Sequence, residues 1–342
     1  MAYPKPLSTK TLERQYSALG LSEQTLGVLR GFFVVCSKLY GAIDMGEVWE
    51  VYKVLNNTQG FPALRRRNLL EFASVARRDV SVPYYVLEIN EIYRDEPVAD
   101  SKKMIVNKEL VGFDTSKYYD VITIDEKAYG KPPYIPDNFL SWNGPPKTDE
   151  EKALLNFLGN LRVSAKEVEV YGYMVKCEHV GEKLKDFVFE SEIYRIAYKW
   201  FSGEHEDGRK TSDQKRLDRL KRSLCSNAAE YLVEEARKDF DYRCPGSRGF
   251  QRFFDNLYEI GVKLTELQSK IVLDFLQEFV NNCHRYSNKG WTPMELGRRS
   301  GPMKGPLSMS FGPGMLEAMR KGDIDRTEVE NFLKEHGIEP VN

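Results

Sequence analysis

The chain has 342 residues, of which 41% are hydrophobic and 30% charged, and its 50 Lys and Arg residues balance 51 Asp and Glu residues. This composition excludes an intrinsically disordered chain and a protein that is polycationic as a whole, so a surface that binds nucleic-acid phosphates has to be a local patch. The length predicts two domains or one large one, with a core that needs no disulfide or metal for stability.

Three features of the sequence predict where the protein resides. No apolar run approaches the ~18 residues that a membrane-spanning helix needs. The N-terminus carries Pro4 and Pro6 and lacks the apolar stretch of a secretory signal. The five cysteines are odd in number and widely scattered, as expected of reduced thiols. We therefore expect a cytoplasmic protein with no membrane partner.

Helix starts recur along the chain together with their capping residues. A Ser, Thr or Asp side chain followed three residues later by Glu or Gln is typical of a first helical turn, because each side chain bonds a backbone N–H of the other residue. The pattern occurs at Asp44–Glu47, Thr148–Glu151, Ser164–Glu167, Thr265–Gln268, Thr292–Glu295 and Asp325–Glu328. Apolar residues at the helical period predict helices through 26–39, 48–55, 69–76, 154–161, 187–201, 224–236 and 271–279.

Strand signals are few and lie in the first half of the chain. The best candidate is Val82–Leu87, and Val121–Ile124 and Tyr134–Ile135 are weaker ones. No alternating series of strands and helices supports a doubly wound sheet. We therefore predict a mainly α, multi-helical fold with a small β element in its N-terminal half.

Proline and glycine mark the expected domain boundaries. Segment 130–147 holds five prolines and is predicted to be an ordered loop. Gly and Pro also interrupt segment 301–314, which leads to a short apolar-striped helix over 327–336. We predict an N-terminal helical domain over 1–145, a C-terminal helical domain over 146–300, and an arm with a docking helix over 301–342.

Motifs for catalysis and metal binding are weak. The segment Gly203–Thr211 resembles a phosphate-binding loop, but Arg209 displaces Lys210 by one place and three acidic residues would repel phosphate. Cys177 and His179 lack the paired spacings of a structural zinc site. We therefore predict a buried thiol there, and no catalytic residue, metal or cofactor in the chain.

Two clusters of basic residues are the candidate nucleic-acid-binding surfaces. Segment 209–222 holds seven basic against two acidic side chains, with three arginines spaced to share one helix face. The acidic stretch 178–207 precedes it and is an alternative partner for this charge. A second basic cluster lies in segment 285–304. The candidate residues are Arg209, Lys210, Lys215, Arg216, Arg219, Arg222, Arg285, Lys289, Arg298 and Arg299.

The second cluster flanks a distinctive string over 281–296, in which a helix ends, Gly290 turns the chain and Thr292-Pro293 opens the next helix. Such a corner either packs against the protein or reads nucleic acid, and packing is the commoner role. Its pattern of Asn282, Arg285-Tyr286, Asn288, Gly290, Thr292-Pro293 and Glu295-Leu296 resembles a C-terminal motif of uncharacterised helical proteins of Gram-positive bacteria.

The N-terminal half carries further pieces of this resemblance, at 44–52, 72–78, 84–87 and 130–136. The resemblance implies a bacterial protein associated with nucleic acid or ribonucleoprotein machinery. Some members of the group carry a C-terminal SEC-C-type zinc motif or a Rho-N-like module. No cysteine follows Cys283 here, so a zinc role is not carried over.

These patterns lead to three functional hypotheses. We expect a non-enzymatic binding or regulatory protein that engages nucleic acid or a nucleoprotein partner through its basic helix faces. The alternative is a protein–protein interaction module, such as an inhibitor, a scaffold or a homo-oligomer that docks its C-terminal arm. A third class is an enzyme with a site built from dispersed carboxylates and tyrosines.

Overall fold

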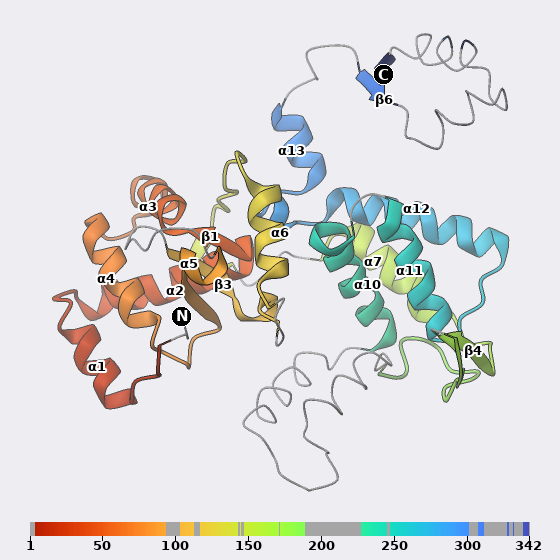
Figure 1. Cartoon of the computed structure of the whole chain (residues 1–342), viewed down its shortest axis with the longest axis horizontal. Coiled ribbons are helices and arrows are strands. Elements are labelled where there is room, and N and C mark those ends of the chain that lie inside the picture. Colours follow the sequence, from red (N-terminus) through yellow and green to blue (C-terminus); the bar gives the residue numbers. More distant parts are fainter. Residues whose placement is uncertain are drawn as a thin grey trace, which may run out of the picture. The chain divides into compact units, whose positions relative to one another are not determined.

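The computed structural model describes the protein over residues 4–93, 103–112, 117–142, 144, 147–170, 172–188, 227–244 and 247–300, and beyond these over 307–310, 327, 331 and 338–341 (Figure 1). The chain is mainly α-helical with a few short strands, as the sequence predicts. It divides into two compact units, Met1–Pro293 and Met294–Asn342. None of the described helices is both long and apolar enough to cross a membrane.

The N-terminal half contains helices around a small sheet. Side chains of Ser8, Ser22 and Asp44 accept backbone N–H bonds at the starts of the first three helices, which explains where these helices begin. The helices are α1 (Thr9–Ser17), α2 (Glu23–Tyr40), α3 (Met45–Gln59), α4 (Arg66–Ala76), α5 (Ile89–Ile92), the 3₁₀ turn η1 (Lys108–Leu110), α6 (Tyr119–Ala128) and the 3₁₀ turn η2 (Phe139–Ser141).

The sheet has three antiparallel strands in the order β1-β3-β2, namely β1 (Ala42–Asp44), β3 (Lys103–Asn107) and β2 (Tyr84–Glu88). Strand β2 confirms the prediction at Val82–Leu87. The central strand β3 is buried along its whole length, and the Nζ of Lys103 reaches Ser74 Oγ at 2.9 Å. This strand was not predicted, because polar residues at both of its ends leave only a short apolar centre, which gives a weak strand signal in the sequence.

The first hydrophobic core is an aromatic cluster between α2, α3 and α4. Phe32 lies at its centre, with ring centroids 5.3 Å from Tyr52, 5.9 Å from Phe61 and 5.5 Å from Phe139. All four side chains are buried. Edge-on and tilted aromatic contacts of this kind add stability beyond the area that they bury.

The second core lies in the C-terminal half of the first unit. Helix α7 packs against α12 and α10, and α10 packs against α11. Thr148 and Thr265 cap the two helices that begin after them, as predicted. The elements are α7 (Asp149–Asn160), the hairpin of β4 (Glu167–Val170) and β5 (Tyr173–Lys176), α10 (Ala228–Lys238), the π-helical turn η3 (Asp239–Arg243), α11 (Ser247–Glu259), α12 (Glu266–Asn282) and the 3₁₀ turn η4 (Tyr286–Asn288).

A proline-rich loop and the corner after α12 join the two cores into one compact unit. The hydroxyl of Tyr40 donates to the carbonyl of Tyr134 at 2.7 Å, and the N–H of Tyr134 donates to the carbonyl of Lys289 at 2.9 Å. The indole N–H of Trp291 donates to the carbonyl of Pro132 at 2.9 Å. The predicted boundary near residue 145 therefore separates two hydrophobic clusters rather than two units.

Three local predictions were wrong. Val121–Ile124 lies inside α6, because Val121, Ile124 and Ala128 are buried at the helical period. The predicted helix start at Ser164 leads instead into β4, whose side chains alternate between exposed and buried. Tyr134 and Ile135 form no strand and belong to the proline-rich loop.

The second unit begins in α13 (Pro293–Ser300), which starts at the predicted Thr292-Pro293. Strands β6 (Leu307–Ser310) and β7 (Ile338–Val341) pair in parallel. Apart from residues 327 and 331, the predicted helix over 327–336 lies outside the described residues, as do the predicted helix over 187–201 beyond residue 188 and the start of the one over 224–236.

We predict that Gly41→Ala destabilises the protein more than Gly60→Ala. Both glycines end helices at positive φ, 70° and 68°. Gly60 has the left-handed helical conformation, with ψ 27°, which costs an L-residue about 1 kcal/mol. Gly41 has ψ −57° and lies outside that allowed region, so its substitution costs at least as much backbone strain. A Cβ at Gly41 would also lie 2.6 Å from the Tyr286 ring, whereas nothing lies within 4 Å at Gly60. Urea unfolding of the two variants measures the difference, and equal losses of stability would contradict this packing.

Candidate functional site

The first basic cluster lies outside the described residues. This holds for Arg209, Lys210, Lys215, Arg216, Arg219 and Arg222. The prediction that they bind nucleic acid therefore stays a prediction.

Two residues of the second cluster are committed to contacts inside the chain. Lys289 is 6% exposed as a residue, and its ammonium pairs with the carboxylate of Glu47. The guanidinium of Arg285 donates to the carbonyls of Phe240 at 3.1 Å and Val280 at 2.7 Å. Lys289 is thus paired inside the chain, while Arg285 is half-buried and bonded to two carbonyls. That these two residues bind nucleic acid stays a prediction. Arg298 and Arg299, in contrast, have exposed side chains in the last turn of α13.

The distinctive string over 281–296 forms a packing corner around a buried carboxylate. Asp241, in the π-helical turn η3, accepts the backbone N–H groups of Tyr286 at 2.7 Å and Ser287 at 2.9 Å. Burial raises the pKa of Asp241, and these bonds oppose the shift. Lys127, in α6, donates to the carbonyl of Asp241. Lys131, just after the end of α6, donates to the carbonyl of Ser287. The Asp241 carboxylate and both lysines thus have partners within the chain, which is typical of a structural network, whereas the buried Nε of the neighbouring Arg285 has none.

The predicted thiol and histidine pair also serves packing. The ring of His179 stacks on Phe187 with centroids 4.1 Å apart, and its Nδ1 lies 3.3 Å from a Glu182 carboxylate oxygen. Burial raises the pKa of all four described cysteine thiols, Cys36, Cys177, Cys244 and Cys283. Over the described part of the chain, no group of three or more His, Cys, Asp or Glu side chains could hold a metal ion.

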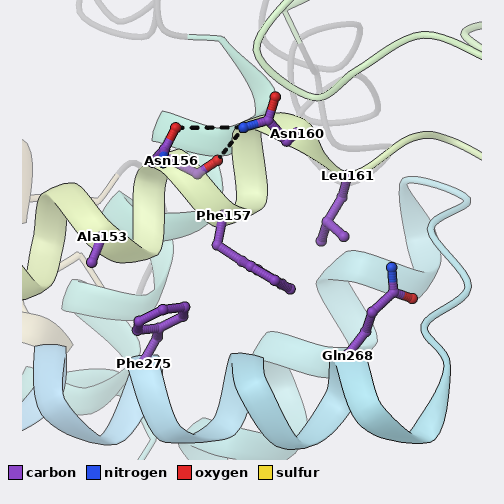
Figure 2. Close-up of a pocket in the computed structure, with 7 residues that line it drawn as sticks. All are labelled: Ala153, Asn156, Phe157, Asn160, Leu161, Gln268 and Phe275. Atoms are coloured by element: carbon purple, nitrogen blue, oxygen red, sulfur yellow. Dashed lines mark hydrogen bonds between the residues drawn. The ribbon is translucent and has the colours of Figure 1, made fainter.

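An open groove lies between α7 and α12 (Figure 2). The two helices run side by side in opposite directions, so Ala153 and Phe275 lie at one end of the groove and Leu161 and Gln268 at the other. The groove has a volume of about 390 Å³, within the range of sites that hold a ligand.

The groove combines aromatic rings with amide side chains. Phe157 and Phe275 point into the space between the helices, with ring centroids 5.7 Å apart, and both are half-buried (Figure 2). Asn156, Asn160 and Gln268 line the groove as well. The side-chain amide of Asn160 donates to the backbone carbonyl of Asn156 at 2.9 Å, and the same amide nitrogen lies 3.4 Å from the side-chain oxygen of Asn156. No titratable side chain is among the residues that line this groove.

The sequence contained only an indirect signal for this groove. The apolar stripes of 154–161 and 271–279 predict helices, and residues of these stripes such as Leu158 and Phe279 are buried. Phe157 and Phe275 lie at the edge of these stripes, beside residues that face solvent. Whether a stripe edge is covered depends on the neighbouring helix, which the helical period alone does not reveal.

Comparison with protein-family models, with curated proteins and with solved structures gives no match. The resemblance to helical proteins of Gram-positive bacteria stays a prediction, and the functional proposals below rest on the geometry of this chain.

We predict that Asp241→Ala lowers the free energy of unfolding by about 2 kcal/mol, because it leaves two buried backbone N–H groups without an acceptor. Asp137→Ala is the control at an exposed position, where surface substitutions change stability by about 0.5 kcal/mol or less. Thermal or urea unfolding measures both variants, and equal losses would exclude a structural role for this carboxylate.

The same variant has a predicted pH dependence. Because the pKa of Asp241 is raised, the folded protein binds this proton more tightly than the unfolded chain does. The contribution of Asp241 is therefore greatest in acid and decreases as the pH rises through its raised pKa. The difference in unfolding free energy between wild type and Asp241→Ala should shrink over that range, and a difference that grows would contradict the direction of the shift.

Proposed function

We propose that the protein is a protein-binding module that takes an apolar peptide segment of a partner into the groove between α7 and α12. The observation that carries the proposal is a pair of half-buried rings, Phe157 and Phe275, that contact each other within an open groove. Aromatic side chains of this kind are enriched at the centres of protein interfaces, because a partner that covers them removes a large apolar area from water.

The groove's polar groups favour a peptide over a charged metabolite. Asn156, Asn160 and Gln268 carry amides, which both donate and accept hydrogen bonds and so match the N–H and C=O groups of a peptide backbone. A metabolite that carries phosphate or carboxylate groups would need cations in the lining, and a catalytic site would need a titratable group. Neither kind of residue lines the groove.

We predict that peptides selected against the protein bind in this groove. A displayed library of random twelve-residue peptides is selected on the immobilised full chain, and the affinities of the enriched peptides are measured in solution. Phe275→Ser should weaken binding about ten-fold or more, since truncation of a central interface aromatic removes about 2 kcal/mol or more. Ala153→Gln, which keeps the core contacts of Phe275 and fills the groove, should weaken binding similarly.

Leu273→Ser is the matched control for this experiment. Leu273 lies on α12, is 41% exposed and does not line the groove, so its substitution should leave peptide affinity unchanged. Enriched peptides that bind all these variants as tightly as the wild type would overturn the proposal.

A second candidate function is the binding of nucleic acid, and one observation favours it. Arg298 and Arg299 are exposed in the last turn of α13, where cationic side chains also suit the helix C-terminus. Together with the basic run over 209–222 in the sequence, they supply charge that is suited to a phosphate backbone.

We predict for this candidate that affinity for a single- or double-stranded oligonucleotide falls steeply with salt and that Arg298→Gln/Arg299→Gln reduces the salt slope. Each lost phosphate contact lowers the slope of log K against log salt by about 0.7 to 0.9. Fluorescence anisotropy between low and moderate salt measures it. An affinity that stays flat over this range would exclude phosphate neutralisation.

A further inference from the structure

One end of the groove carries acidic side chains. Glu150 lies three residues before Ala153 on α7, and Glu278 lies three residues after Phe275 on α12. Residues three apart in a helix share a face, so each glutamate extends the groove face of its helix by one turn. Figure 2 shows Ala153 and Phe275 at the same end of the antiparallel helices. By their helical spacing from these two residues, both glutamates flank that end. We call it the acidic end.

The nearby cations are already paired with other carboxylates. Lys152 lies 2.8 Å from Asp149, and Arg237 lies 2.8 Å from Glu151. Among the described residues, neither Glu150 nor Glu278 forms an ion pair. Within the described chain, therefore, no cation forms an ion pair with either of these two carboxylates.

The opposite end differs in charge. The residues next to Leu161 and Gln268 are Arg162, whose guanidinium donates to the carbonyl of Gly181 at 2.6 Å, and Leu267, which is 69% exposed. Lys263 is exposed nearby in the chain, before the start of α12. Glu266 is also exposed at the start of α12, so this end carries charges of both signs. The groove thus runs from an acidic end to an end of mixed charge with an exposed apolar residue.

We propose that the partner segment carries Lys or Arg at the acidic end of the groove, next to apolar side chains that contact Phe157 and Phe275. This inference rests on the proposed function and adds the charge and the placement of the ligand. Opposite charges at the rim of an interface steer association and fix which way round a ligand lies. A single basic side chain can reach both Glu150 and Glu278, since lysine and arginine side chains are long and flexible.

The test is a parallel peptide selection on the full wild-type chain and on Glu150→Lys/Glu278→Lys. Peptides enriched on the wild type should combine Phe, Leu or Trp with an excess of Lys and Arg, whereas peptides enriched on the variant should carry Asp or Glu instead. A wild-type-selected peptide should bind the variant about ten-fold more weakly, because two favourable rim contacts become repulsive. Replacing its basic residue by Glu should restore binding to the variant, and added salt should reduce both effects.

Glu13→Lys/Glu126→Lys is the control, because it changes net charge equally at two exposed positions outside the groove and should leave affinity unchanged.

Two outcomes separate the two proposals. Groove-dependent peptides without a basic excess, bound equally by wild type and charge-reversed variant, would overturn the inference and leave the protein-binding function standing. Peptides that are insensitive to Phe275→Ser and Ala153→Gln would overturn the function itself. Far-ultraviolet circular dichroism establishes that each variant is folded before binding is measured.

Discussion

The arrangement of the first unit depends on the hydrogen bonds that the carboxylate of Asp241 accepts. It lies in a π-helical turn, a geometry in which one extra residue displaces the backbone and presents side chains that a regular helix would not. From there it holds two consecutive N–H groups of the corner after α12. A buried charge is costly unless it is bonded, so the corner can adopt this position only with the carboxylate in place. Lysines from α6 and its C-terminal side bind neighbouring carbonyls and close the network.

The packing of the same corner gives a basic residue within it a structural role. Lys289 has a left-handed backbone, the one described non-glycine residue with positive φ, and its side chain pairs with Glu47 of α3. Burial raises the pKa of Glu47, and the bond from Lys289 opposes that shift. A lysine that appears in the sequence as part of a basic surface is therefore an internal counter-ion that joins two halves of the unit.

Much of the fold could be predicted because its signals are local. Side-chain caps at Asp44, Thr148 and Thr265 begin helices where the sequence places them, and the buried stripes follow the helical period. The central strand β3 could not be predicted, since its pairing with β1 and β2 joins residues far apart in the chain. The β-branched run over 121–124 was assigned to the wrong element because helical burial prevailed over intrinsic strand preference.

The candidate site was less predictable than the fold. Its aromatic rings and amides are ordinary helix residues, and only the spacing between α7 and α12 leaves them half-covered. The charges of Glu150 and Glu278 acquire significance only when their neighbours are seen to pair elsewhere, as Lys152 and Arg237 do. Sequence charge counts report totals, whereas recognition depends on which charges remain after internal pairing.

The contact between Gly41 and Tyr286 has a consequence for the order in which the protein is made. The aromatic core uses residues up to Phe139, so it can assemble while the rest of the chain is still being synthesised. The end of α2 is covered in part by Leu110 and by Asn107, whose N–H donates to the carbonyl of Gly41, and it receives the ring of Tyr286 only after the corner has been synthesised. A nascent chain that lacks the corner therefore has this face only partly covered, and the packing at the end of α2 is completed by residues from the far end of the first unit.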